Sequence, residues 1–452
     1  MDMGRRQAQE RKQIVSTVAA VCMWGREIGA VSVGGPGQAA TFEYTAAFMR
    51  SGIEVAPIMM PLSGRIYRFA DLSTASFHGL PGMLADALPD KFGNAVIDAW
   101  LAAQGRLPKD IDAVERLCYT GSRGIGALEF KPERGPQNRK STPLKIDALV
   151  KLAADVLNNR ENLQASFANG ERERALREIL HVGASAGGAR AKAVIAWNPT
   201  TNEVRSGQVE ALTGFEHWLL KLDGVSNNND RDLADPPGFG ALEYAYSLMA
   251  KAAGIRMAEC RLLEENGRRH FMTRRFDRLA DGEKLHMQSL GAIAHFDFNN
   301  PLSHSYEQAL TVIRRLRLPM NDIEEQFRRM VFNVIARNQD DHVKNIAFLM
   351  DKKGEWSLSP AFDVMYAYNP SGAWTANHQM SAAGKRDGFT MDDLKTVAAT
   401  GSMQRGRAES IAREVAAAVS RWREFATQAS VFPKQIDQIA RAHRLDLVKP
   451  LA

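Results

Sequence analysis

The sequence predicts an α+β protein in which a β-rich first half precedes a mostly helical second half. Three observations predict this class: strand-like alternation near the N-terminus, a second group of strand-like segments in the middle, and helical periodicity after about residue 280. The 452 residues are 45% hydrophobic, which is enough to build two or three packed domains. The sequence shows no internal repeat and no long low-complexity segment.

Composition narrows the class of protein. The three cysteines, Cys22, Cys118 and Cys260, lie too far apart to form a metal-ligand pair or a disulfide framework, which predicts a cytoplasmic protein with free thiols. No apolar run reaches the length of a membrane helix, so we expect no membrane partner. The net charge of +6 allows nucleic acid, ATP or acidic partners, although the basic residues are scattered and also fit solvated helix faces.

The first part of the chain, residues 14–135, has α+β character. Residues 25–33 and 40–48 alternate apolar and polar side chains as strands do. The basic start followed by an apolar stretch over 14–24 loosely resembles a secretory signal, but it favours a first β-strand entering a turn. Helical spacing follows and is broken at Pro89. A hydrophilic stretch then predicts a connection between domains.

The middle of the chain predicts a helix, a glycine-rich loop, two strands, an amphipathic helix and a hairpin, over residues 145–280. The strands are expected at 192–197 and 217–224, the helix at 240–255, and the hairpin turn at Asn266-Gly267. Further strand-like pieces lie near Ile346–Met350 and Trp356–Leu358 in the helical half.

This order of elements is the layout of a two-lobed, protein-kinase-like fold. We therefore predict an N-terminal α/β domain at 14–135 and a β-rich N-lobe with a glycine-rich loop at 145–280. A mostly helical C-lobe at 281–452 would carry the catalytic loop.

The segment "ARNQDDHVKNIAFLMD" is the richest in chemistry. Asp340 and Asn345 are five residues apart, as are the catalytic aspartate and the metal-binding asparagine of protein kinases. Such an aspartate orients the attacking hydroxyl and accepts its proton, while the amide oxygen holds Mg²⁺ against the phosphates. Asp341 competes for the role of base, and a polar turn that caps a helix is the simpler alternative.

Asp363 follows a predicted strand and a Ser-Pro turn, eighteen residues after Asn345. A second carboxylate at this place predicts a Mg²⁺ ligand, whereas a helix cap or turn residue is the alternative. Two acidic positions and an amide separated by a strand pair favour the metal site.

Two lysines and a group of glycines predict contacts with phosphate. Gly183, Gly187 and Gly188 lie in "HVGASAGGARAKAVIAW", where glycine lets backbone N–H groups approach phosphate oxygens. Lys192 follows this loop, and Lys221 ends an apolar strand. Plain turns and a lysine that reaches outward to solvent are the alternatives.

Six segments in order resemble the HipA family of bacterial serine/threonine kinase toxins: "GASAGGARAK", "WLLKLDG", "EYAYSLMAKAAGI", "TRRFDR", "NQDDHVKN" and "LSPAFDV". "HGLPGMLADALPDKFG" and "YTGSRGIGALEF" resemble the N-terminal part of that family. The resemblance covers about residues 20 to 380. Its most specific motif is "DDHVKN", which fits the family pattern Asp-x-His-x-Lys-Asn.

The resemblance implies an ATP- and Mg²⁺-dependent serine/threonine protein kinase with Asp340 as catalytic residue and Asn345 and Asp363 at the metal. It also implies autophosphorylation at Ser185, which would turn activity off. The implied ATP-binding residues are Gly187, Gly188, Ala189, Arg190, Ala191, Lys192, Lys221, Arg274, Arg275, Phe276, His342, Val343, Lys344, Asn345, Phe362, Asp363, Val364 and Met365. Of these, residues 274–276 would receive adenine through their backbone.

The resemblance further implies partners. These are a protein substrate such as an aminoacyl-tRNA synthetase and a small helix-turn-helix antitoxin, through which DNA contact would be indirect. Two alternatives stay open: a small-molecule phosphotransferase of kinase-like fold, and a nucleotide-binding corepressor without catalysis.

Overall fold

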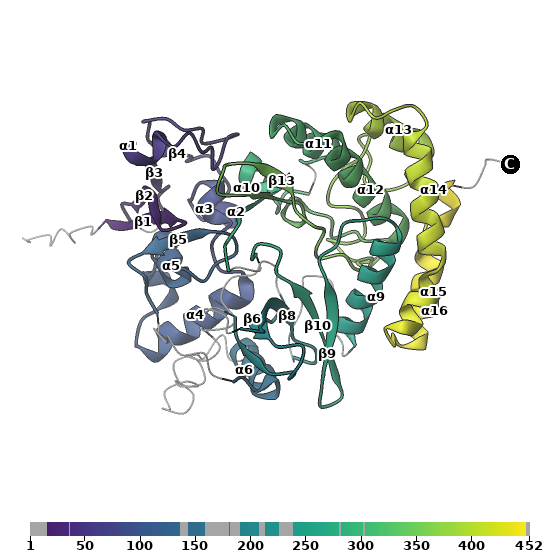
Figure 1. The fold of residues 1–452 in the computed structure, drawn as a ribbon, viewed down its shortest axis with the longest axis horizontal. Coiled ribbons are helices and arrows are strands. Elements are labelled where there is room, and N and C mark those ends of the chain that lie inside the picture. Colours follow the sequence, from purple (N-terminus) through teal and green to yellow (C-terminus); the bar gives the residue numbers. More distant parts are fainter. Residues whose placement is uncertain are drawn as a thin grey trace, which may run out of the picture.

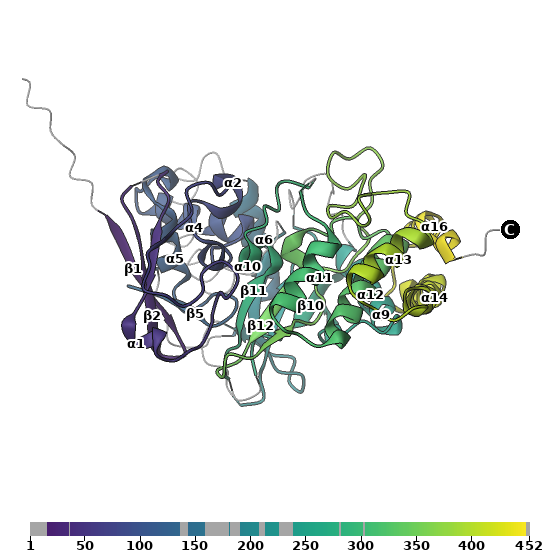
Figure 2. The same ribbon diagram turned by 90° about the horizontal axis from the view of Figure 1, so that it is seen from above.

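The computed structural model describes residues 16–35, 37–135, 143–158, 180, 190–207, 213–225, 238–279, 282–301 and 303–448. Within them, two five-stranded sheets and one three-stranded sheet organise an α+β, two-lobed kinase-like fold. Figure 1 shows the N-terminal sheet at one end of the molecule and helices α13 to α16 at the other. In Figure 2 the same two groups again occupy opposite ends, with the other strands and helices between them.

The first sheet is antiparallel throughout. Its spatial order is β4 (Tyr67–Arg68), β3 (Thr41–Tyr44), β2 (Arg26–Val33), β1 (Thr17–Met23) and β5 (Leu128–Lys131). The strands predicted over 14–24 and 25–33 are therefore confirmed. The strand predicted over 40–48 was too long: Thr45 accepts a hydrogen bond from the Phe48 backbone N–H and caps a short helix instead.

The described residues of the N-terminal part also contain five α-helices: α1 (Ala46–Met49), α2 (Thr74–Phe77), α3 (Gly82–Ala85), α4 (Lys91–Ala103) and α5 (Ala113–Thr120). The predicted break at Pro89 is confirmed, because Asp90 caps α4 by accepting from the Gly93 N–H at 2.6 Å. Phe92 and Trp100 of α4 are buried in one hydrophobic cluster with Trp218 of the second sheet. The N-terminal part thus shares a core with the strands that follow it.

The second sheet is also antiparallel. Its order is β7 (Val204–Ser206), β6 (Lys192–Trp197), β8 (Glu216–Lys221), β10 (Arg268–Arg274) and β9 (Cys260–Glu265). The predicted hairpin turn is confirmed, with φ of +48° at Asn266 and +76° at Gly267, as a tight two-residue turn requires. Helices α6 (Ile146–Asn158) and α9 (Phe239–Ala252) stand where the sequence placed helices.

The C-terminal part contains half of the α-helices in the described residues: α10 (Leu290–Ala294), α11 (Tyr306–Arg315), α12 (Met320–Ala336), α13 (Met391–Thr400), α14 (Arg407–Ser420), α15 (Trp422–Gln428) and α16 (Pro433–Ala442). The third sheet has the order β11 (His286–Ser289), β12 (Ala347–Met350) and β13 (Trp356–Leu358). Strand β11 was not predicted, because only one of its four residues, Met287, is apolar and the segment shows no apolar alternation. Residues 359–390, all described, contain neither helix nor strand, so the prediction of a mostly helical pattern was wrong there.

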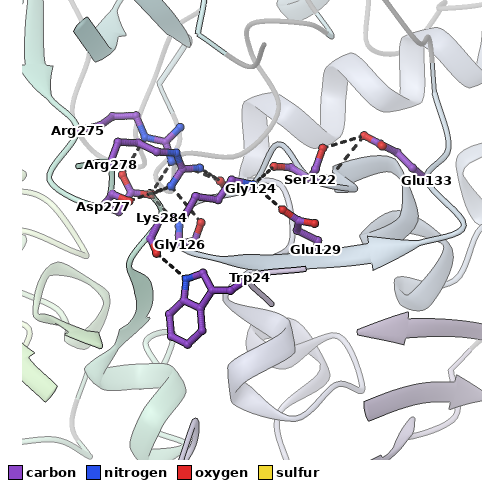
Figure 3. A network of polar contacts seen from close by, with 10 residues as sticks. All are labelled: Trp24, Ser122, Gly124, Gly126, Glu129, Glu133, Arg275, Asp277, Arg278 and Lys284. Carbon is purple, nitrogen blue, oxygen red and sulfur yellow. Dashed lines mark hydrogen bonds and ion pairs between the residues drawn. The ribbon is translucent and has the colours of Figure 1, made fainter. Parts of the chain in front are cut away.

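A buried ionic network joins the N-terminal part to the chain after β10 (Figure 3). The Asp277 carboxylate accepts from Arg275 at 2.6 and 2.9 Å, from Arg278 at 2.8 Å and from the Gly126 N–H at 2.8 Å. Both arginines also donate to the Gly124 carbonyl. Burial alone would raise the pKa of Asp277, but the two arginines outweigh it and lower that pKa. We call these residues the domain junction.

The same junction continues toward β1 and β5. Lys284 donates to Glu129 at 2.8 Å and to the Ser122 carbonyl at 2.9 Å, and the Trp24 indole donates to the Lys284 carbonyl at 2.6 Å. These contacts fix the N-terminal part against the kinase-like core. Among the described helices, none combines the length and apolarity needed to cross a bilayer.

Candidate active site

A cavity of about 660 Å³ opens between the N-terminal part and the kinase-like core. Residues around α3 and α4 form one wall, and residues 340–345 and 362–365 contribute to the other. Ten of the residues proposed from the sequence line it: Arg190, Lys192, Lys221, Asp340, His342, Lys344, Asn345, Phe362, Asp363 and Met365. Segments more than 150 residues apart in the sequence therefore line the same cavity.

The loop after α12 presents Asp340 to this cavity. The helix ends at Arg337, which takes the left-handed conformation with φ of +59°. The Asn345 side-chain N–H donates to the Asp340 carbonyl at 2.8 Å, which closes the loop between them. The Trp374 indole N–H donates to Asp340 Oδ1 at 2.7 Å, and His342 Nε2 lies 3.9 Å from the same oxygen.

The neighbouring Asp341 faces the opposite way, into the protein. Its side chain is 1% exposed, whereas that of Asp340 is 23% exposed. Asp341 accepts from the Tyr306 hydroxyl at 2.5 Å and from the Gln379 N–H at 2.7 Å, and its Oδ2 lies 2.7 Å from His378 Nδ1. Burial alone would raise the pKa of Asp341, but these partners lower it. Asp341 is thus placed to hold the loop, and Asp340 is placed to meet a ligand.

Lys221 joins two carboxylates across the cavity. Its ammonium lies 2.6 Å from Glu243 of α9 and also contacts Asp363. Burial alone would raise the pKa of Asp363, but attraction to Lys221 and Lys192 lowers it to about 2. Burial alone would lower the pKa of Lys221, but the two carboxylates raise it above its ordinary value. Lys221 and Asp363 are therefore charged near neutral pH, whereas burial raises the pKa of Glu243 and the attraction of Lys221 opposes that rise.

Lys192 reaches the cavity from the first position of β6. Its ammonium lies 3.2 Å from Asp90 Oδ2, and both side chains are less than 5% exposed. Because Asp90 caps α4, this ion pair joins the N-terminal part to the strand that follows the glycine-rich loop.

Six described residues of the proposed set do not line the cavity: Ala191, Arg274, Arg275, Phe276, Val343 and Val364. The backbone N–H groups of Arg274 and Arg275 already donate to carbonyls of Glu259 and His217. The Arg275 side chain belongs to the domain junction, while the Phe276 ring lies 5.8 Å from the Phe362 ring that does line the cavity. Ser185, Gly187, Gly188 and Ala189 lie outside the described residues, as does Gly183.

The cavity offers few ligands to a metal ion. Among the described residues, no group of three or more His, Cys, Asp or Glu could hold one. Asn345 and Asp363 nevertheless line the same space, and the Asn345 N–H is already donated, which leaves its amide oxygen as the ligand atom. One carboxylate and one amide fit Mg²⁺, which usually takes its other ligands from phosphates and water.

Three residues that contact the side chains proposed from the sequence were themselves missed: Glu243, Asp90 and Trp374. Glu243 is 2% exposed on an amphipathic helix, and its charge beside an apolar stripe was the one signal available. The contacts of Asp90 and Trp374 depend on tertiary folding, and no local pattern marks them.

Comparisons with known proteins agree with this geometry. Residues 19–131 match the family described as HipA N-terminal domain, and residues 184–422, more than half of the chain, match HipA-like C-terminal domain. The structure resembles HipA of Shewanella oneidensis, solved with HipB and operator DNA, with a TM-score of 0.64 at 15% identity over 95% of this chain and 96% of that one.

A curated relative is the candidate kinase Y4mE of Sinorhizobium fredii, which is 25% identical over 138 residues. That alignment covers 28% of this chain and only 33% of the relative. The two family matches span the N-terminal sheet and the loop with Asp340 that borders the cavity, and on them this chain belongs to the HipA family.

Proposed function

We propose that this chain is an ATP-dependent serine/threonine protein kinase of HipA type that acts in the cytoplasm. The observation that carries the proposal is the convergence of Asp340, Asn345 and Asp363 with the Lys221–Glu243 ion pair on one cavity. Kinases require a lysine–glutamate pair, a metal-binding carboxylate and amide, and a carboxylate for the acceptor hydroxyl. The family membership supports the same reaction class.

In the proposed reaction the acceptor hydroxyl is oriented by Asp340 and gives its proton to that carboxylate. The acceptor oxygen forms a bond to the γ-phosphorus of ATP, the bond from that phosphorus to the β–γ bridging oxygen breaks, and ADP leaves. Lys221, held by Glu243, would contact the α- and β-phosphates, and Lys192 would be the second cation. Mg²⁺, held by Asn345 and Asp363, would neutralise phosphate charge.

Adenine would lie beyond Phe362, toward Phe276. Because the N–H groups of Arg274 and Arg275 are used within the sheet, we propose that adenine contacts the backbone at or after Phe276. Ala191, Val343 and Val364 would then support the pocket from behind without touching the nucleotide. The glycine-rich loop with Gly187 and Gly188 would cover the phosphates.

The proposed substrate, partner and autophosphorylation site are those that membership of the HipA family suggests. The substrate would be a protein such as an aminoacyl-tRNA synthetase. A helix-turn-helix antitoxin would be the partner, because the similar Shewanella oneidensis protein was solved with HipB and operator DNA. Autophosphorylation of Ser185 would add roughly −1.5 to −2 charges beside the ATP phosphates and so oppose nucleotide binding.

The test is incubation of the purified protein with γ-labelled ATP, alone and with bacterial lysate, followed by mass mapping of phosphorylated residues. We expect label on protein serines or threonines, including Ser185, and none on Ser185 in a Ser185→Ala variant. Label confined to small molecules would instead support a phosphotransferase of kinase-like fold. ATP binding without any transfer would support a corepressor.

A further inference from the structure

Residues 374–379, which follow Asp363 in the chain, contact the loop that carries Asp340 and Asp341. Within residues 374–379, Trp374 donates its indole N–H to Asp340 Oδ1 at 2.7 Å. His378 and the Gln379 backbone N–H each lie 2.7 Å from an oxygen of Asp341. One segment therefore contacts both consecutive aspartates, which have different environments and exposures.

The segment is itself tied to the loop and to its own backbone. The Gln379 side-chain N–H donates to the Trp374 carbonyl, and the Gln339 side-chain N–H donates to the Ala376 carbonyl at 3.2 Å. The Asn369 N–H donates to the Thr375 carbonyl at 3.4 Å. These bonds fix the backbone of the segment from which the Trp374 indole reaches the Asp340 carboxylate.

Trp374 reaches Asp340 without taking space from a ligand. It is half-buried and is not among the residues that line the cavity. Its ring centroid lies 6.5 Å from that of His342, and the His342 centroid lies 5.9 Å from that of Phe298. A carboxylate has about four acceptor sites, so an N–H at one of them can orient the group while a hydroxyl donates to another.

We propose that Trp374 is a positioning residue for the phosphotransfer reaction: its indole N–H sets the orientation of the Asp340 carboxylate toward the acceptor hydroxyl. This inference rests on the proposed function. Under this proposal, residues 374–379 take part in catalysis through the contact between Trp374 and Asp340. A tryptophan that merely covered and blocked Asp340 would have the opposite effect, since its removal would increase the rate.

The test is Trp374→Phe, which keeps an aromatic ring and removes the N–H. A hydrogen bond to a charged group corresponds to a change of about ten- to a hundredfold, so kcat for transfer should fall by that factor. The KM and dissociation constant for ATP should stay within about twofold. Trp24→Phe is the matched control, because it removes an indole N–H that donates to a carbonyl at the domain junction, and its kcat should be unchanged.

Two further variants separate positioning from general damage. In an Asp340→Asn background Trp374→Phe should cause no additional loss, because a positioning residue acts only through the carboxylate it positions. Gln379→Met removes the side chain that holds the Trp374 carbonyl and keeps the backbone N–H on Asp341, and it should lower kcat while sparing the KM for ATP.

The outcomes distinguish the two proposals. Transfer by the wild-type protein together with an unchanged or increased kcat in Trp374→Phe overturns the role of Trp374 alone. An additive loss in the double variant also overturns it. Absence of transfer from the wild-type protein overturns the proposed function, and the role of Trp374 with it.

Discussion

The domain junction and the candidate active site both contain buried ion pairs, but those of the active site border a cavity. At the junction, Asp277 has its oxygens taken by Arg275, Arg278 and a backbone N–H, and all three side chains are buried. At the active site, Lys221 and Asp363 are also paired, but they border a cavity of about 660 Å³. A closed ionic network fixes two parts of the fold, while one that borders open space can exchange its partners for a charged ligand.

The largest effect on stability is expected at the junction. Asp277→Ala leaves two buried guanidinium groups without their shared carboxylate, which should lower the free energy of unfolding by about 3–5 kcal/mol. Denaturant unfolding followed by circular dichroism measures this. Asp437→Ala, which removes an exposed ion pair with Arg423, is the control and should cost at most about 1 kcal/mol. Equal losses in the two variants would remove the distinction between the regions.

The next effect concerns the ligand. Asp363→Ala should weaken binding of Mg²⁺-ATP at least about tenfold more than binding of ATP without metal, because a carboxylate that bridges metal and phosphates matters only when the metal is present. Calorimetric titrations with Mg²⁺ and with a chelator give the two affinities. A similar loss under both conditions would make Asp363 a structural partner of Lys221.

The sequence predicted single residues better than pairs. Asp340, Asn345 and Asp363 were proposed from their spacing along the chain and Lys221 from its place at the end of an apolar strand, and the structure brings all four to one cavity. Their partners were not found, because an ion pair between segments leaves no periodic signal. Glu243 illustrates this: it lies 22 residues from Lys221 and reads locally as one polar position on a helix.

The fold shows the same limit. Long alternating or amphipathic segments such as β2 and α9 were predicted with nearly correct bounds. Strand β11 was missed, because four residues that include a buried histidine and a buried glutamine carry no apolar alternation. Residues 359–390 were expected to be mostly helical, yet their order comes from contacts such as those on Asp341, which depend on the tertiary fold.

A smaller effect should appear on acidification. Burial lowers the pKa of His270 and of His286 to about 4, whereas a histidine in the unfolded chain has a pKa of about 6.5. Both imidazoles are fully buried. Their neutral forms therefore contribute fully to the free energy of unfolding above about pH 6.5, and this contribution is lost as the pH falls from there toward 4.

Each of these two histidines should lower the free energy of unfolding by about 1–2 kcal/mol when the pH falls from 7 to 5. Denaturant unfolding at both pH values measures the loss, and His286→Gln should reduce it. Stability that stays level over this range would show that these imidazoles already accept protons in the folded protein.

The most direct measurement compares two adjacent aspartates. Asp340→Asn should lower the rate of phosphate transfer from labelled ATP by roughly 10²–10⁴ while leaving folding and ATP affinity intact, because Asp340 faces the cavity. Asp341→Asn should instead lower stability, because Asp341 is buried among Tyr306, His378 and Gln379. Undiminished transfer by Asp340→Asn, or loss of transfer in a stable Asp341→Asn variant alone, would contradict the assignment of Asp340 as the catalytic carboxylate.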